Sequence, residues 1–163
     1  MFDNTGEDAD SDGIPIEWEW KWGYNPFEKN SHANLDLDID GLDNIEEYLT
    51  SQWGSDPFRQ DIFLEIDQME IGPNGEGSTI SQLTKDLLKI AFDRRNIVLH
   101  IDDGCMDGGQ TNIPFDEETS YPELENIYFN FFLNGDSDYW RKGVFHYALI
   151  LYHATGRFCL QQR

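Results

Sequence analysis

One sequence pattern occurs twice in the first third of the chain and restricts how that part can fold. Three aspartates alternate with other residues, a glycine follows the third aspartate, and a glutamate lies six positions after the glycine. The copies span residues 8–19 and 36–47, so the repeat period is 28 residues. A glycine at this point tolerates a positive φ. The pattern therefore predicts a tightly curled loop that leads into a helix.

The alternating aspartates predict a calcium site in each loop. Ca²⁺ takes about six to eight oxygens at about 2.3–2.6 Å, and a curled twelve-residue loop directs alternate side chains inwards. The final glutamate can add two oxygens, and the residue after the glycine can add its backbone carbonyl. The predicted metal ligands are Asp8, Asp10, Asp12, Ile14 and Glu19 in the first loop, and Asp36, Asp38, Asp40, Leu42 and Glu47 in the second.

The ninth position differs between the two loops. Asn44 in the second loop can hold a ligating water, whereas Ile16 in the first cannot. We therefore expect the first site to recruit a water or an outside group, and Asp3 and Asn4 are candidates. The alternative is an acidic, solvated turn without metal, because Asp and Gly also favour turns. Two complete copies of the pattern favour the metal sites.

Aromatic residues follow each loop. A Trp-Gly-x-(Asn/Asp)-Pro-Phe segment occupies residues 22–27 and again 53–58. The first repeat also contains Trp18, Trp20 and Tyr24, which could form a carbohydrate platform or pack in a core. Because Trp18 and Trp22 lie four residues apart on one helix face, core packing is the favoured interpretation.

Residues 8–58 resemble the thrombospondin type 3-like or dockerin-like calcium repeats of prokaryotic surface proteins. The resemblance rests on the phrases DADSDGIPIEWEWKWGYNP and LDLDIDGLDNIEEYLTSQWGSDP. It implies a structural pair of EF-hand-like calcium loops rather than a signalling switch. This segment lacks the cysteines of thrombospondin repeats, which leaves the metal as its main cross-link.

The pattern changes after residue 58 to short apolar segments of strand and helix type. We predict an α+β or α/β fold, with a helical tandem calcium-loop module at 1–58 and a β-α-β-loop-β-α sub-domain at 59–163. Thr79 and Gln82 are expected to form a capping box at the first helix, and the first two strands are expected to be parallel. The predicted strands are 61–67, 96–102 and 127–133, and 105–123 is predicted to be a loop. One helix is predicted to start at residue 79. A second is predicted to run from 139 to 155 and to end at Gly156.

The second part resembles the N-terminal part of a metzincin-like zinc metallopeptidase-like domain, through the phrases DIFLEID, LHIDDG and WRKGVFHYAL. The zinc motif of that family, H-E-x-x-H, is absent from this sequence. His146 and His153 lie about 10.5 Å apart along a helix, too far to share one zinc. We expect these histidines, His32 and His100 to be packed or solvated. The sequence therefore does not support a Zn²⁺ site, and no catalytic residue is identified. The resemblance implies that the zinc-binding helix lies beyond Arg163.

Charge and composition narrow the function further. The chain carries 32 Asp and Glu against 11 Lys and Arg, a formal net charge of −21, which disfavours nucleic acids and anionic lipids. The longest apolar run, 144–152, is about half a membrane span. Cys105 and Cys159 allow one disulfide or two separate thiols. Asp102 and Asp103 suggest a turn more than a carboxylate pair for acid–base chemistry.

We therefore predict a calcium-binding structural or interaction module of a secreted or cell-surface protein, in which two Ca²⁺ ions stabilise the fold. Its expected partners are calcium ions, other surface proteins or the remainder of a larger polypeptide, with no nucleic acid and no membrane insertion. The alternative is the front portion of a secreted zinc-dependent peptidase whose H-E-x-x-H helix lies outside the chain. A cytosolic calcium sensor is disfavoured because the chain has only three methionines.

Overall fold

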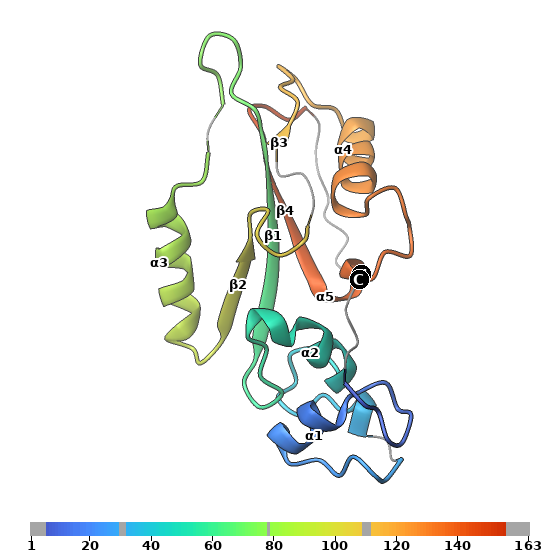
Figure 1. The fold of residues 1–163 in the computed structure, drawn as a ribbon. Helices are drawn as coiled ribbons and strands as arrows, with labels where there is room; N and C mark the ends of the chain where they lie inside the picture. The colour runs from blue at the N-terminus through green and yellow to red at the C-terminus, as the bar shows by residue number, and fades with distance from the viewer. Residues whose placement is uncertain (1–5, 30–31, 78, 109–111, 156–163) are drawn as a thin grey trace. The chain divides into compact units, whose positions relative to one another are not determined.

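The structure is a computed structural model that describes residues 6–29, 32–77, 79–108 and 112–155 (Figure 1). The chain divides into two compact units. Unit 1 comprises Met1–Ile62 and Phe92–Val98, and unit 2 comprises Phe63–Ala91 and Leu99–Arg163. Helices and parallel strands occur together, so the fold is of the mixed α+β class that the sequence predicts.

Unit 1 contains two loop–helix repeats. The first loop leads into α1 (Ile16–Trp22) and the second into α2 (Asn44–Thr50), and the short 3₁₀ helices η1 (His32–Asn34) and η2 (Ser51–Trp53) follow them in turn. Both α-helices begin at the ninth position of the repeated pattern, so the last glutamate of each pattern lies one turn inside its helix. This placement turns the glutamate side chain back towards the loop, because helical side chains lean towards the helix N-terminus.

Aromatic packing forms the core of unit 1. Ile14, Trp18 and Ala33 are buried together, and Tyr24 stacks on Trp18 with ring centroids 5.9 Å apart and an interplanar angle of 1°. Core packing is therefore confirmed for Trp18, whereas Trp20 is 62% exposed. Ile14, the residue after the loop glycine, thus anchors the first loop in this core.

Unit 2 is built around the parallel pairing of β1. In the described part of the chain the sheet has four strands: β1 (Asp61–Met69), β2 (Val98–Asp102), β3 (Asn112–Ile113) and β4 (Phe145–Ile150). Phe63 to Gln68 of β1 pair in parallel with Phe145 to Ile150 of β4, and the end of β1 pairs in parallel with β3. The predicted strands at 61–67 and 96–102 are confirmed.

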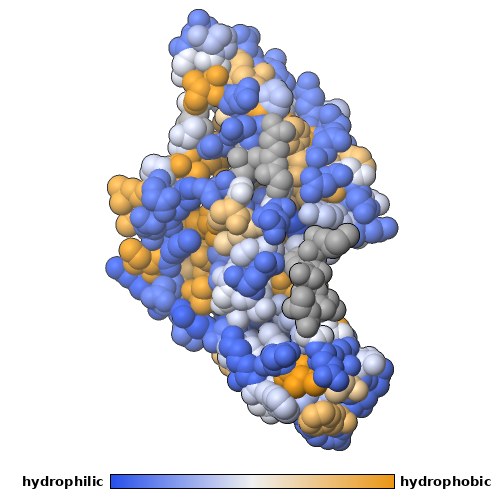
Figure 2. Space-filling view, in the orientation of Figure 1, coloured by the Kyte–Doolittle hydropathy of each residue, from blue (hydrophilic) through white to orange (hydrophobic). Residues whose placement is uncertain are grey.

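The helix that joins β1 to β2 is α3 (Gln82–Asp93). The predicted capping box is wrong: the Ser81 hydroxyl, rather than that of Thr79, accepts the Thr84 backbone N–H at 3.1 Å. Every residue of this helix is at least partly exposed, and its apolar side chains Leu83 and Leu87 are 68% and 56% exposed. Figure 2 shows apolar patches within a largely hydrophilic surface on the side where α3 lies.

The predicted strand at 127–133 is wrong, because this segment is helical. It comprises the end of α4 (Tyr121–Ile127) and a π-helix, η3 (Tyr128–Phe132). The Ser120 backbone N–H donates to the Glu123 carboxylate at 2.7 Å, a capping interaction that favours a helix start within the predicted loop. The aromatic residues satisfy both a two-residue and a four-residue spacing, so their pattern alone did not distinguish strand from helix.

The predicted helix at 139–155 is also wrong. Only α5 (Arg141–Val144) is helical, its N-cap is Trp140 rather than Asp138, and the chain then continues as β4. The apolar run after Val144 has no clear period, so pairing with β1 decides its conformation. The predicted C-terminal glycine of this helix, Gly156, lies outside the described residues.

Two further predictions concern the same part of the chain. Cys105 is exposed, and Cys159 lies outside the described residues, as does any disulfide between them. Among the described helices, none has both the length and the apolar character needed to cross a membrane.

Candidate metal centres

The two loops of unit 1 have the same backbone conformation. Their fourth residues, Ser11 and Ile39, have φ values of 62° and 64°, and their glycines, Gly13 and Gly41, have φ values of 101° and 99°. A left-handed φ is costly for the β-branched Ile39. The positive φ occurs at the same position in both loops, so the hydrogen bonds that close the loop outweigh the backbone preference of the residue at this position.

The first aspartate of each loop holds this conformation. The Asp8 carboxylate accepts the backbone N–H of Ser11 at 2.7 Å and that of Gly13 at 3.0 Å. Asp36 makes the two equivalent bonds in the second loop, also at 2.7 and 3.0 Å. Desolvation raises the pKa of Asp8, but these backbone donors lower it by more, so its net pKa is below the ordinary value. Asp8 therefore stays ionised at neutral pH.

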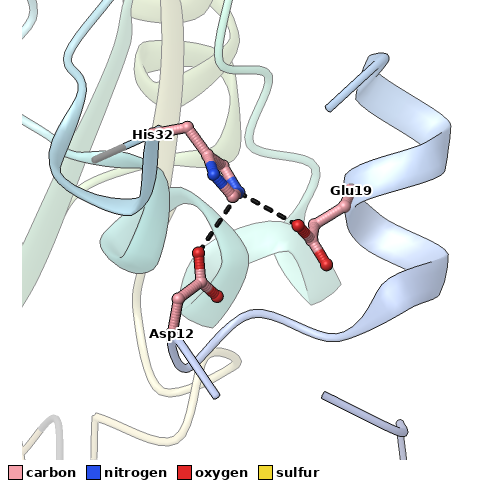
Figure 3. Close-up of side chains that lie close together, drawn as sticks. All are labelled: Asp12, Glu19 and His32. Carbon is pink, nitrogen blue, oxygen red and sulfur yellow. Dashed lines mark ion pairs between the residues drawn. The ribbon is translucent and has the colours of Figure 1, made fainter. Parts of the chain in front are cut away.

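The first site, site 1, gathers donor atoms from the loop, from α1 and from η1. Ligand atoms of Asp8, Asp10 and Asp12 lie within 4.8 Å of one another, and so do those of Asp12, Glu19 and His32. Figure 3 shows the His32 imidazole pointing at both carboxylates. Its Nε2 lies 3.3 Å from Asp12 Oδ2 and 3.2 Å from Glu19 Oε1.

Glu19 is the least compensated carboxylate of site 1. Its side chain is fully buried; Oε1 has only the ion-pair contact with His32 Nε2 at 3.2 Å, and Oε2 has no hydrogen-bond donor in the described part of the chain. Desolvation, and then the charges of Asp10, Asp12 and Asp8, raise its pKa to about 7. Both oxygens of Asp10 are also buried without a hydrogen-bond donor among the described residues. A cation in such a cluster would offset the repulsion between its ionised carboxylates.

The second site, site 2, has the same construction with a different outside residue. Ligand atoms of Asp36, Asp38 and Asp40 lie within 4.8 Å of one another, and Asp40, Glu47 and Asp61 form a second such group. The Asp61 backbone N–H donates to Asp40 Oδ2 at 2.7 Å, which holds the start of β1 against the loop. Site 2 therefore presents oxygen donors from five carboxylates.

Burial perturbs the carboxylates of site 2 as it does Glu19. Glu47 is only 2% exposed, and desolvation raises its pKa to about 8, although the Ser55 hydroxyl donates to Oε2 and opposes the rise. Its other oxygen has no donor among the described residues. Desolvation, and then the charges of Asp40 and Asp36, raise the pKa of Asp38 to about 6.

Both clusters match the dimensions of a hard divalent cation site. Oxygens on opposite sides of a Ca²⁺ ion lie about 4.6–5.2 Å apart, so donors within 4.8 Å of one another fit into a single coordination shell. At each site two such groups of three share one aspartate, Asp12 at site 1 and Asp40 at site 2, and together they include all eight predicted carboxylates. The side chains of Ile14 and Leu42 are buried and anchor the loops, and carbonyl ligation by these two residues stays a prediction.

Sequence reasoning missed one residue of each cluster. His32 follows Glu19 by thirteen residues, and Asp61 follows Glu47 by fourteen, each after the aromatic Pro-Phe segment. This nearly equal spacing was the available signal. The predicted outside ligands Asp3 and Asn4 lie outside the described residues.

The Asn44 side chain makes hydrogen bonds with protein groups, and its predicted role in holding a ligating water stays a prediction. Its side-chain N–H donates to the His32 backbone carbonyl at 2.7 Å, and it is only 1% exposed. A residue of the second repeat thereby fixes the segment that supplies the histidine to site 1.

The acidic residues at the end of β2 in unit 2 have protein partners. Asp102 is buried, accepts from Arg141 Nη2 at 2.5 Å, and accepts the Gly104 backbone N–H at 2.9 Å. Asp103 pairs instead with Lys85. The two carboxylates therefore serve a turn and two separate ion pairs, which favours the turn interpretation over acid–base chemistry.

Comparison of the chain with family models, with curated proteins and with solved structures found no match. The resemblances to calcium repeats and to a metallopeptidase-like domain therefore stay predictions.

Proposed function

We propose that this chain is a calcium-binding structural or interaction module in which two Ca²⁺ ions, one in each loop, stabilise unit 1. The observation that carries this proposal is the pair of buried glutamates. Glu19 and Glu47 occupy the same position of the repeat and are 0% and 2% exposed. One oxygen of each, Oε2 of Glu19 and Oε1 of Glu47, has no partner among the described residues. A cation in each loop satisfies both.

A stabilising role follows from the arrangement of the ligands. Each ion would join a loop, the helix after it and a residue thirteen or fourteen positions beyond the helical glutamate. An ion at a hundred times its Kd stabilises the folded state by about 2.7 kcal/mol. We further propose that the protein acts outside the cell, where calcium is abundant enough to keep modest sites filled.

Calorimetric titration of the chelated protein with Ca²⁺ tests the proposal. We expect two ions per chain, and loss of one ion in E19Q and of the other in E47Q, because each substitution removes a charged ligand but keeps the side-chain shape. The matched controls are E17Q and E46Q, which remove a charge from the same two helices at positions outside the clusters. Retention of two ions in E47Q, or no calcium uptake by the unaltered protein, would contradict the proposal.

A further inference from the structure

Building on the proposed calcium sites, we propose that site 1 is a mixed nitrogen–oxygen centre, completed by His32, that binds Zn²⁺ in preference to Ca²⁺. Site 2 has carboxylates only and keeps its preference for Ca²⁺. The loops share one backbone conformation, but the outside residue is His32 in one and Asp61 in the other. Among the ligand groups gathered at the two sites, the difference in donor type therefore comes from His32 and Asp61.

The spacing of the donors around His32 suits a small ion. Zn²⁺ binds imidazole nitrogen at about 2.0–2.1 Å and carboxylate oxygen at about 2.0–2.2 Å, which places neighbouring donors of a tetrahedral shell about 3.3–3.5 Å apart. The distances from Nε2 to Asp12 Oδ2 and to Glu19 Oε1 are 3.3 and 3.2 Å. The two contacts therefore match a tetrahedral edge with little rearrangement.

The histidine ring is held in this position by its surroundings. It is 4% exposed and stacks on Tyr24, with ring centroids 4.8 Å apart and an interplanar angle of 20°. Its backbone carbonyl accepts from the Asn44 side chain at 2.7 Å and from the Leu35 backbone N–H at 3.0 Å. A ligand fixed in this way loses little freedom when it binds a metal, as is typical of supported metal sites.

A second, independent observation points to a ligand at the same place. Glu19 is fully buried beside the histidine, and its second oxygen, Oε2, lacks both a hydrogen-bond donor and an ion-pair partner within the described residues. Imidazole favours Zn²⁺ and similar ions, whereas carboxylates without nitrogen suit Ca²⁺. Site 1 offers two carboxylates and one imidazole, with the other aspartates of the loop nearby. This set of donors therefore favours Zn²⁺ over Ca²⁺.

The test is a zinc titration of the calcium-loaded protein against a chromogenic chelator, followed by measurement of bound calcium. We expect one Zn²⁺ to bind per chain and one Ca²⁺ to be released. In H32D, which supplies an oxygen where the histidine was, the zinc affinity should fall by more than about tenfold while two Ca²⁺ remain bound. The control H146Q changes an exposed histidine of β4 and should leave both values unchanged.

A ligand-specific readout on the unaltered protein makes the result independent of how the variants fold. Correlation of the imidazole nitrogens with their ring protons should show a zinc-induced shift of His32 Nε2. An unshifted Nε2, or equal zinc affinity in H32D, would overturn the proposal and leave His32 as an ion-pair partner of Asp12 and Glu19. If no calcium binds at all, the proposed function fails, while zinc titration of the chelated protein still decides the His32 site.

Discussion

Replacement of Glu47 by glutamine should change stability in opposite directions with and without calcium. Glu47 is 2% exposed, and its carboxylate lies close to those of Asp40 and Asp61. In chelated protein, E47Q removes a buried charge from an acidic cluster, so we expect it to stabilise the fold. In excess calcium, the same substitution removes a charged ligand, so we expect it to destabilise the fold.

The size of the first effect follows from the pKa of Glu47, which burial raises from 4.5 to about 8. In the window between these values the folded state binds more protons than the unfolded state, so stability falls as the pH rises. Each pH unit in that window costs about 1.4 kcal/mol, which amounts to about 3 kcal/mol at pH 7. In chelated protein, E47Q should raise the free energy of unfolding at pH 7 by up to this amount. With calcium at a hundred times its Kd, E47Q should lower the free energy of unfolding by about 2.7 kcal/mol, because site 2 no longer binds its ion.

Urea denaturation at pH 5, 7 and 8, with chelator and with excess calcium, measures both effects. Chelated unaltered protein should lose stability between pH 5 and pH 8, and E47Q should lose less. The matched control is E46Q on the same helix. Its glutamine can still accept the Asp43 backbone N–H that Glu46 accepts at 3.1 Å, and it should show no reversal.

Equal destabilisation of E47Q in chelator and in calcium would refute this reasoning. That result would mean that protein groups, the Ser55 hydroxyl among them, already satisfy the ionised Glu47 carboxylate. The glutamate would then be a structural hydrogen-bond acceptor rather than a ligand held ready for a cation.

Two further substitutions test side chains that hold other residues in place, Asn44 in unit 1 and Arg141 in unit 2. N44A removes the hydrogen bond to the His32 backbone carbonyl. It should therefore weaken zinc binding at site 1 by about tenfold and leave calcium binding at site 2 unchanged. If calorimetry shows weaker calcium binding at site 2 instead, Asn44 is a ligand of site 2. R141M removes the fully buried guanidinium that pairs with Glu65 at 2.9 Å and with Asp102 at 2.5 Å, and should cost about 3–5 kcal/mol at pH 7 by urea denaturation. The exposed K142M is its control, and equal stability of the two variants would show that the buried carboxylates do not need the arginine.

The loops were predictable from sequence because their structure is local. The alternating aspartates, the glycine and the glutamate determine which backbone N–H groups Asp8 and Asp36 bind, and all of these lie within one twelve-residue segment. Local pattern also found β1, whose apolar residues alternate along the chain, and β2, which is a short apolar segment before an Asp-Asp-Gly turn.

Two of the errors concern segments whose conformation or contacts depend on distant parts of the chain, whereas the strand predicted at 127–133 failed on an ambiguous local spacing. The apolar run at Phe145–Ile150 suits a helix as well as a strand, and it becomes β4 because β1, some eighty residues earlier, offers it a parallel edge. His32 and Asp61 were missed for a related reason. Each reaches its cluster only through the path of the chain after the aromatic segment, which the loop pattern does not describe.

The repeat therefore separates two properties of the sites. Residues inside the pattern set the shape of each loop, which is why the φ angles and hydrogen bonds of the two copies agree within a few degrees and tenths of an ångström. Residues outside the pattern complete the ligand sets, and these differ in chemistry. A duplicated loop can thus keep its fold while one copy changes its preferred ion, because a change at His32 or Asp61 alters a donor atom without altering the backbone bonds that close the loop.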